Sequence, residues 1–203
     1  MPIESEFTLA LPYWIDDAVA DVPEFLPSPE ERMGLVNALA DENWRRGNGG
    51  PFAAIVVERE SGRLVSVGVN VVLASGISSA HAEGMALGLA QKAVGSWDLG
   101  GSGLPEHELV VNWRPCIQCY GSAMWSGITS LFVAGSGPEL EEISTFDEGP
   151  LTADWAEEFE SRGITVTENV LRDEALAVFR AYREAVDAGG VLVYNARGQS
   201  DEG

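Results

Sequence analysis

The sequence predicts an α/β fold: a three-layer α/β/α sandwich in which one five-stranded mixed sheet carries helices on both faces. The first reason is the order of segments, because five strand-like segments are interleaved with helical ones, which is typical of one sheet covered on two sides. The second is a hairpin pattern early in the chain. The third is size, since 203 residues with 45% hydrophobic side chains can bury a substantial core.

The first helix of the predicted domain has a clear start signal. Ser28 is a good N-cap, Pro29 suits the first helical position, and acidic residues occupy the first turn. An apolar stripe with helical spacing then continues, so we expect a helix over 28–46. The preceding residues 1–27 read as an extension, within which residues 7–11 are strand-like.

The next two segments predict a hairpin. Residues 52–57 form a nearly continuous apolar run, which is typical of a strand buried on both faces. A Ser-Gly turn follows, and residues 64–69 return. The remaining predicted elements are helices over 80–94, 115–125 and 171–188, strands over 108–113, 130–134 and 163–167, and a short helical turn over 139–146.

The chain is expected to form one domain over 28–188, with residues 1–27 as an N-terminal extension. The glycine-rich tail, 189–203, is expected to act as a lid or to be disordered after about residue 196. No apolar stretch reaches the length of a membrane span, and no secretory signal is visible at the start. We therefore expect a cytoplasmic protein without membrane contact.

The charge balance excludes several partners. Twelve lysine and arginine residues stand against 32 aspartate and glutamate residues, which gives a net charge of −20. Affinity for a phosphate backbone comes from basic side chains that displace counterions, so nucleic acid is an unsuitable partner. The acidity favours a small substrate that is not strongly anionic.

Two short motifs supply a possible metal site. Cys116 and Cys119 are three residues apart at the start of a predicted helix, so their sulfurs can face one ion. The positive end of the helix dipole favours thiolates there. His81 precedes another predicted helix, and two thiolates with one imidazole make the three protein ligands of a catalytic zinc site. The sequence therefore predicts Zn²⁺ as the cofactor.

Glu83 supplies the acid–base group that such a site needs. It lies two residues after His81, in the first turn of the same predicted helix. A carboxylate beside zinc and water can take a proton and then give it to a leaving amine. This combination is the chemistry of hydrolytic deamination of a heteroaromatic ring.

The pattern H-x-E…P-C-x-x-C, as His81-Ala82-Glu83 and Pro115-Cys116-Ile117-Gln118-Cys119, resembles the cytidine deaminase superfamily. Within it the chain looks most like the guanine deaminases, because the first ligand is His81 and a glycine-rich stretch, 47–52, precedes the first strand. The resemblance implies conversion of guanine to xanthine and ammonia, a small heterocyclic amine as substrate, and a homodimer.

The resemblance also implies further site residues. Asn70 is expected to bind the base, Trp125 to shape the pocket, and Asp147 to act as a second catalytic acid. Ordinary readings stay open for each: Asn70 as a turn cap, Trp125 as core packing and Asp147 as part of an acidic turn. The other candidate substrate contacts are Phe52, Ala82, Arg114 and Tyr194, the last as part of a lid.

Other interpretations remain open as well. Arg114 stands where the family commonly has an acid, so it pairs with an acid of the fold or contacts the substrate. The substrate could be another amino-heterocycle: cytosine, a nucleoside, a triazine or a pathway-specific metabolite. The chain could also be a non-catalytic zinc-binding homologue, and the two cysteines alone could form a redox pair or half of a structural zinc site. His107 reads as an ordinary surface or edge residue.

Overall fold

The computed structural model describes residues 3–150 and 152–195. It contains one five-stranded sheet with helices on both faces, which confirms the predicted fold class. The helices are α1 (Trp14–Val19), α2 (Pro29–Arg45), α3 (Val72–Ser75), α4 (Ala82–Val94), α5 (Ile117–Trp125), α6 (Glu139–Ser144), α7 (Trp155–Glu160) and α8 (Arg172–Asp187). The strands are β1 (Ala53–Glu58), β2 (Leu64–Val69), β3 (His107–Val111), β4 (Ser130–Val133) and β5 (Thr165–Thr167).

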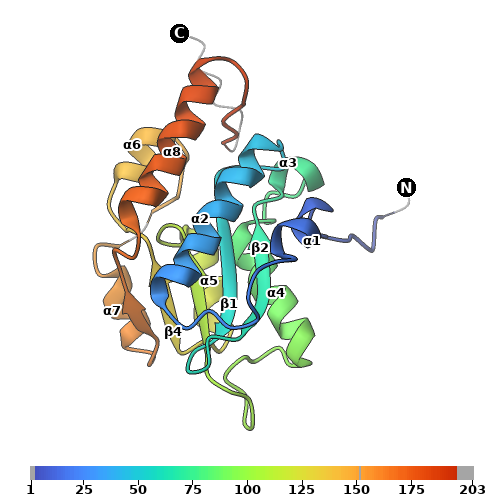
Figure 1. Ribbon diagram of the computed structural model, residues 1–203, viewed down its shortest axis with the longest axis vertical. Helices are drawn as coiled ribbons and strands as arrows, with labels where there is room; N and C mark the ends of the chain where they lie inside the picture. The colour runs from blue at the N-terminus through green and yellow to red at the C-terminus, as the bar shows by residue number, and fades with distance from the viewer. Residues whose placement is uncertain (1–2, 151, 196–203) are drawn as a thin grey trace.

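The sheet has the strand order β2-β1-β3-β4-β5. The β1–β2 hairpin is antiparallel, β1 is also antiparallel to β3, and β3, β4 and β5 run parallel to one another. The parallel pairs need crossovers, which α5 and the α6–α7 region provide (Figure 1). The sheet is therefore mixed, as the sequence predicts.

Each face of the sheet has its own hydrophobic core, because side chains alternate along a strand. On β1, Ile55 and Val57 pack into the core that includes α2 and α8, whereas Ala54 and Val56 pack into the core that includes α4 and α5. Figure 1 shows α2 in front of the sheet and α5 behind it. The continuous apolar run of β1 is thus explained by burial on both sides.

One edge of the sheet brings three chain segments together. Ala53 at the start of β1 is opposite Val69 at the end of β2, and Ala54 is opposite Val111 at the end of β3. The residue before β1, the residue after β2 and the loop 112–116 therefore meet at this edge. The candidate site lies there.

Local sequence signals explain the first long helix. The Ser28 hydroxyl accepts a hydrogen bond from the Glu31 backbone N–H at 3.2 Å, and the Glu31 carboxylate accepts one from the Ser28 N–H at 2.9 Å. This reciprocal capping box, with Pro29 in the first turn, fixes where α2 begins. Helix α8 carries its apolar stripe, including the fully buried Phe179 and Tyr182, against the same core.

The structure corrects the expectations for the N-terminal extension. Residues 7–11 form no strand, since no neighbouring strand pairs with them. The extension instead contains α1, which contributes the buried Trp14 and Ile15 to the core around α2. The expected disorder after residue 196 concerns residues 196–203, which lie outside the described residues.

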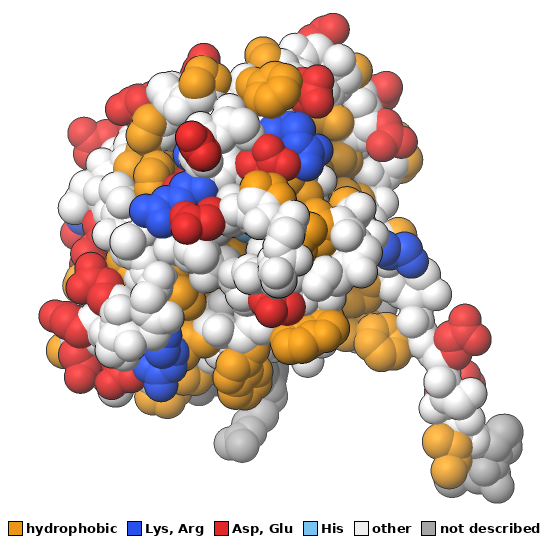
Figure 2. Space-filling view, turned by 90° about the horizontal axis from the view of Figure 1, so that it is seen from below, with side chains coloured by type: hydrophobic (Ala, Val, Ile, Leu, Met, Phe, Trp, Pro, Cys, Tyr) orange, Lys and Arg blue, Asp and Glu red, His pale blue; other side chains and the backbone are white. Residues whose placement is uncertain are grey.

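The described part of the chain contains no helix that is both long and apolar enough to cross a membrane. Acidic side chains are spread over the face in Figure 2, with fewer basic ones among them. This distribution is what a net charge of −20 requires, and it gives the protein an anionic surface.

Candidate metal centre and the cavity beside it

Three side chains form a compact group of possible metal ligands: His81, Cys116 and Cys119. One ligand atom of each lies within 4.8 Å of the others, and His81 Nδ1 lies 3.4 Å from Cys116 Sγ. Neighbouring ligands of one tetrahedral zinc ion are about 3.5–3.8 Å apart, given usual Zn–N and Zn–S bond lengths. The donor set and the spacing therefore both fit zinc, with a fourth position left for water or substrate.

Two helix starts place these ligands. His81 is the N-cap residue of α4 and Cys116 that of α5, both with extended backbone, while Cys119 lies within the first turn of α5. The partial positive charge of a helix N-terminus favours the thiolate form of a nearby cysteine. The hydrogen bond from Cys119 also stabilises the thiolate of Cys116. It outweighs burial, which opposes the charge, and the pKa of Cys116 falls to about 4. The site is thus prepared to ligate a cation.

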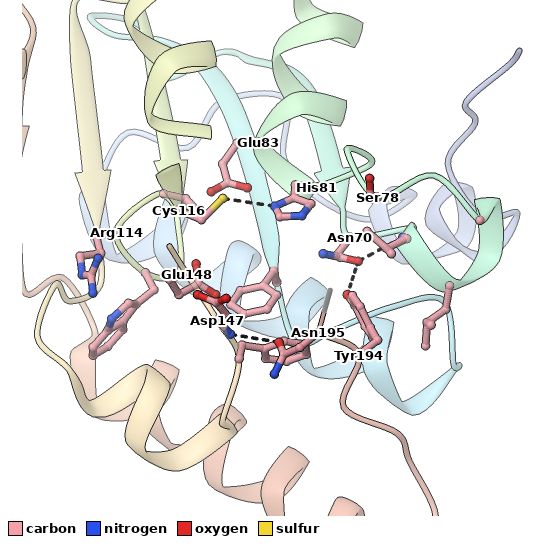
Figure 3. A pocket seen from close by; sticks show the side chains of 17 residues that line it. Asn70, Ser78, His81, Glu83, Arg114, Cys116, Asp147, Glu148, Tyr194 and Asn195 are labelled. Atoms are coloured by element: carbon pink, nitrogen blue, oxygen red, sulfur yellow. Dashed lines mark hydrogen bonds between the residues drawn. The ribbon is translucent and has the colours of Figure 1, made fainter. Parts of the chain in front are cut away.

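Glu83 is buried beside these ligands, with 6% of its surface exposed. Burial raises the pKa of its carboxyl group, and the negative charge of Cys116 adds to the effect. Figure 3 shows the carboxyl group next to His81 and Cys116. A buried carboxyl group in this position can hold or release a proton at the metal centre.

A cavity of about 520 Å³ opens beside the ligands. It is large enough for a heterocyclic base, and its wall combines apolar side chains with a few polar groups, as small-molecule sites do. Its lining residues include Phe52, Asn70, Leu73, His81, Glu83, Trp113, Arg114, Cys116, Phe146, Asp147, Glu148, Tyr194 and Asn195.

Asn70 is held with its amide nitrogen toward this cavity (Figure 3). Its Oδ1 accepts hydrogen bonds from the Val72 N–H at 3.1 Å and from the Tyr194 hydroxyl at 2.7 Å. The Tyr194 oxygen in turn accepts a hydrogen bond from the Gly50 N–H at 2.8 Å. With the oxygen of Asn70 occupied twice, the side chain presents its N–H groups to a ligand.

Two adjacent acids, Asp147 and Glu148, line the cavity on the segment that follows α6. Asp147 lines the cavity but is exposed, and its Oδ1 accepts a hydrogen bond from the Gly149 N–H at 3.0 Å. Its neighbour Glu148 is partly buried, and burial together with the charge of Cys116 raises its pKa to about 8. No motif in the sequence marks Glu148; its one signal is that it directly follows Asp147. The positive φ of Gly149 (76°) belongs to the turn that orients both residues.

The remaining candidate substrate contacts divide into two groups. Phe52 lines the cavity and packs edge-on against Phe146, with ring centroids 5.4 Å apart. Ala82 and Trp125 are not among the lining residues of this single chain, and their roles in substrate binding stay predictions. Ala82 is fully buried where α4 packs closely on β2, and Trp125, at the end of α5, is 81% exposed. In a single chain neither side chain shapes the cavity.

Arg114 has an acid as its partner, one of the two readings left open by the sequence. It forms an ion pair with Glu141 of α6, and its Nε donates a hydrogen bond to the Ser136 carbonyl at 2.7 Å. His107 is also different from its expectation. It is fully buried, with Nδ1 2.7 Å from the Leu99 carbonyl oxygen, because β3 begins one residue earlier than predicted.

Comparisons with known proteins agree with this geometry. Residues 27–135 match the cytidine and deoxycytidylate deaminase zinc-binding region. The chain is 30% identical over 145 residues to guanine deaminase from Bacillus subtilis strain 168, covering 71% of this chain and 87% of the relative. It is 42% identical to the solved structure of guanine deaminase from Nitrosomonas europaea, with a TM-score of 0.83 over 91% of this chain and all of that one. It is 44% identical to the structure of NE0047 in complex with 2,6-diaminopurine, with a TM-score of 0.83 over 94% of this chain and 97% of that one.

Proposed function

The chain belongs to the cytidine and deoxycytidylate deaminase family with a zinc-binding region, and we propose that within it this protein is a guanine deaminase. Its relatives from Bacillus subtilis and Nitrosomonas europaea carry that name, and the similarity covers most of each chain. The observation that carries the proposal is the cavity in which the three metal ligands, Glu83 and the oriented amide of Asn70 converge.

The reaction replaces the amino group of guanine by oxygen: a C–O bond to water forms, a C–N bond breaks, and ammonia leaves. His81, Cys116 and Cys119 would hold Zn²⁺, which when bound acidifies water near neutral pH. Glu83 accepts a proton from the attacking water and later delivers it to the departing nitrogen. Its burial keeps this proton inside the site.

Residues that line the cavity beyond the metal ligands bind the substrate. The Asn70 amide donates to an acceptor atom of the purine ring, since its own oxygen is already hydrogen-bonded. Phe52 and Phe146 provide an apolar wall for the ring. Tyr194 closes the far side, and burial raises the pKa of its hydroxyl, so it stays protonated as a donor to Asn70. These contacts favour an uncharged aromatic base.

The direct test measures ammonia release from guanine by the zinc-loaded protein. We expect guanine to be used with the largest kcat/KM in a panel that also contains cytosine, cytidine, guanosine, 2,6-diaminopurine and an aminotriazine. A larger kcat/KM for another member would assign the site to that amine. Failure on the whole panel by protein that holds one zinc per chain would support the non-catalytic alternative.

Glu148 is proposed as the second proton carrier in place of Asp147. Glu148→Gln is expected to lower kcat about 100-fold, which is within the range for one acid–base group, because the amide cannot donate the same proton. The neighbouring variant Asp147→Asn keeps the turn and is expected to stay within about threefold of wild type, since it loses only an exposed carboxylate. Steady-state ammonia release measures both variants, and equal losses in the two would contradict the assignment.

Three further features are part of the proposal. A homodimer is supported by two large exposed apolar side chains on α5, Ile117 and Trp125, and light scattering of the purified protein decides it.

A cytoplasmic location is supported by the two cysteines, which need a reducing compartment to remain thiols, and fractionation of expressing cells tests it. The absence of nucleic-acid partners is supported by the net charge of −20, and a binding assay at low salt tests it.

A further inference from the structure

Arg114 connects two segments of the site that are far apart in the sequence. It precedes Pro115 and the metal ligand Cys116, in the loop after β3. Its partner, Glu141, lies 27 residues later on the short helix α6. The arginine side chain is 12% exposed and the glutamate side chain 30%, so water screens this ion pair only partly.

The arginine is also fixed by backbone contacts. Its own N–H donates to the Gly135 carbonyl at 2.8 Å, and its Nε donates to the Ser136 carbonyl at 2.7 Å. Both carbonyls belong to the loop between β4 and α6. Figure 3 shows the guanidinium to one side of the cavity, away from His81 and Asn70. Its Nε and Nη2 groups are therefore held by the loop after β4 and by α6, while the side chain also lines the cavity.

The segment from α6 to Glu148 is short and internally bonded. The Ser144 hydroxyl donates to the Leu140 carbonyl at 2.7 Å and accepts from the Phe146 N–H at 3.2 Å. Leu140 is fully buried and Phe146 is 6% exposed, which fixes the segment in the core. A displacement of α6 would therefore be transmitted to Glu148.

A second contact joins the same two segments at their other end. The Glu148 carbonyl accepts a hydrogen bond from the Ile117 N–H at 3.0 Å, and Ile117 directly follows Cys116. The segments 114–117 and 141–148 are thus linked at both ends, by the Arg114–Glu141 ion pair and by this hydrogen bond. An acid at position 114 would instead face the negative charge of Glu141.

We propose that Arg114 is a positioning residue, which acts through Glu141 to hold Glu148 against the loop that carries Cys116. The proposal rests on the deaminase function proposed above, in which Glu148 delivers a proton. Arg114 touches neither substrate nor metal in this role. This role accounts for a cation two residues before the metal ligand Cys116.

The test compares variants of the ion pair in the full-length, zinc-loaded protein. Arg114→Gln is expected to lower kcat by about 10- to 100-fold through a small displacement of Glu148, with KM for guanine within about twofold and zinc still at one per chain. Glu141→Gln should give the same loss, and the double variant should lose no more than either single variant. Arg114→Lys, and the exchange Arg114→Glu with Glu141→Arg, should each recover part of kcat.

The other ion pair of α6 provides a matched control. Glu139, the first residue of α6, pairs with Arg172 of α8, whose guanidinium also lies over the Trp113 ring, 5.6 Å from its centroid. Among the described residues, Glu139 itself forms no side-chain hydrogen bond or ion pair with the loop 114–117. Glu139→Gln breaks this pair and is expected to lower the melting temperature about as much as Glu141→Gln, while kcat stays within about twofold. If kcat of this control variant fell as far as that of Arg114→Gln, Arg114 would only help to hold α6 in the fold, and the proposal would be overturned.

Hydrogen exchange supplies a readout that does not depend on activity. If Arg114 holds Glu148 in place, the Ile117 amide should exchange at least about fivefold faster in Arg114→Gln than in wild type. Unchanged exchange or unchanged kcat would overturn the proposal, as would loss of zinc or a rise in KM at constant kcat. Wild-type protein that does not release ammonia from guanine would instead overturn the proposed function. The exchange rates would still show whether Arg114 holds Glu148 against the loop that carries Cys116.

Discussion

Replacing Glu83 by glutamine is expected to remove nearly all ammonia release from guanine and leave zinc in place. Glutamine has the same shape but cannot accept a proton from water, so turnover should fall by about 10²- to 10⁴-fold, the usual contribution of a general acid–base group. The fold should not suffer, because a buried carboxyl group costs free energy that a neutral amide avoids. Steady-state rates and the zinc content per chain measure the two effects separately.

The control for this variant is Glu60→Gln, which removes a carboxylate from an exposed turn between β1 and β2. Its turnover should equal that of wild type. If Glu83→Gln released ammonia at the wild-type rate, the proton would have another carrier and the proposed mechanism would be wrong. If it lost zinc as well as turnover, Glu83 would be a support of the ligands rather than a proton carrier.

Removing the metal is expected to abolish activity and to destabilise the fold. Cys119 is fully buried and adjacent to the other two ligands. Mutation of a side chain that hydrogen-bonds to a zinc ligand lowers zinc affinity by up to roughly 100-fold. Cys119→Ser should lower it further, because it replaces a ligand itself. Since ligand binding stabilises only the folded state, the melting temperature should fall together with the zinc content.

Chelated wild-type protein serves as the comparison for that variant. Removal of zinc from wild type should give the same loss of turnover and of melting temperature, and added zinc should restore both. Added zinc should not restore Cys119→Ser at a comparable concentration. Full turnover in protein shown by atomic emission to contain no metal would contradict the metal centre.

Local signals explain why most of the fold could be predicted. Helix α2 begins where its cap, proline and acids indicate, and β2 has the predicted bounds because a tight turn and its antiparallel partner fix them. Helix α1 was not predicted, since its burial comes from packing against α2 rather than from a pattern within residues 1–27. Helix α7 likewise depends on packing, through its buried Trp155 and Phe159, and the four-residue α3 has no buried residue that could mark it. The alternating residues 7–11 have no strand to pair with.

The site shows the same division between local and distant information. His81, Glu83, Cys116 and Cys119 could be found because spacing near helix starts limits where their side chains point. The sequence could not show which of two adjacent acids lies deeper in the cavity. That choice depends on the turn at Gly149 and on the contact of the segment with α5, which are fixed only in three dimensions.

The hydrogen bonds of Tyr194 have a consequence for how the cavity fails on heating. This residue joins Gly50 and Asn70 across 144 and 124 positions of the chain, through a short stretch that follows α8 and belongs to no helix or strand. Segments with few buried contacts open locally at a lower free-energy cost than the core. Sub-global opening of residues 191–195 would remove one of the two hydrogen bonds that orient the Asn70 amide, while the sheet stays intact. Inactivation by heat should therefore begin before the cooperative unfolding of the domain.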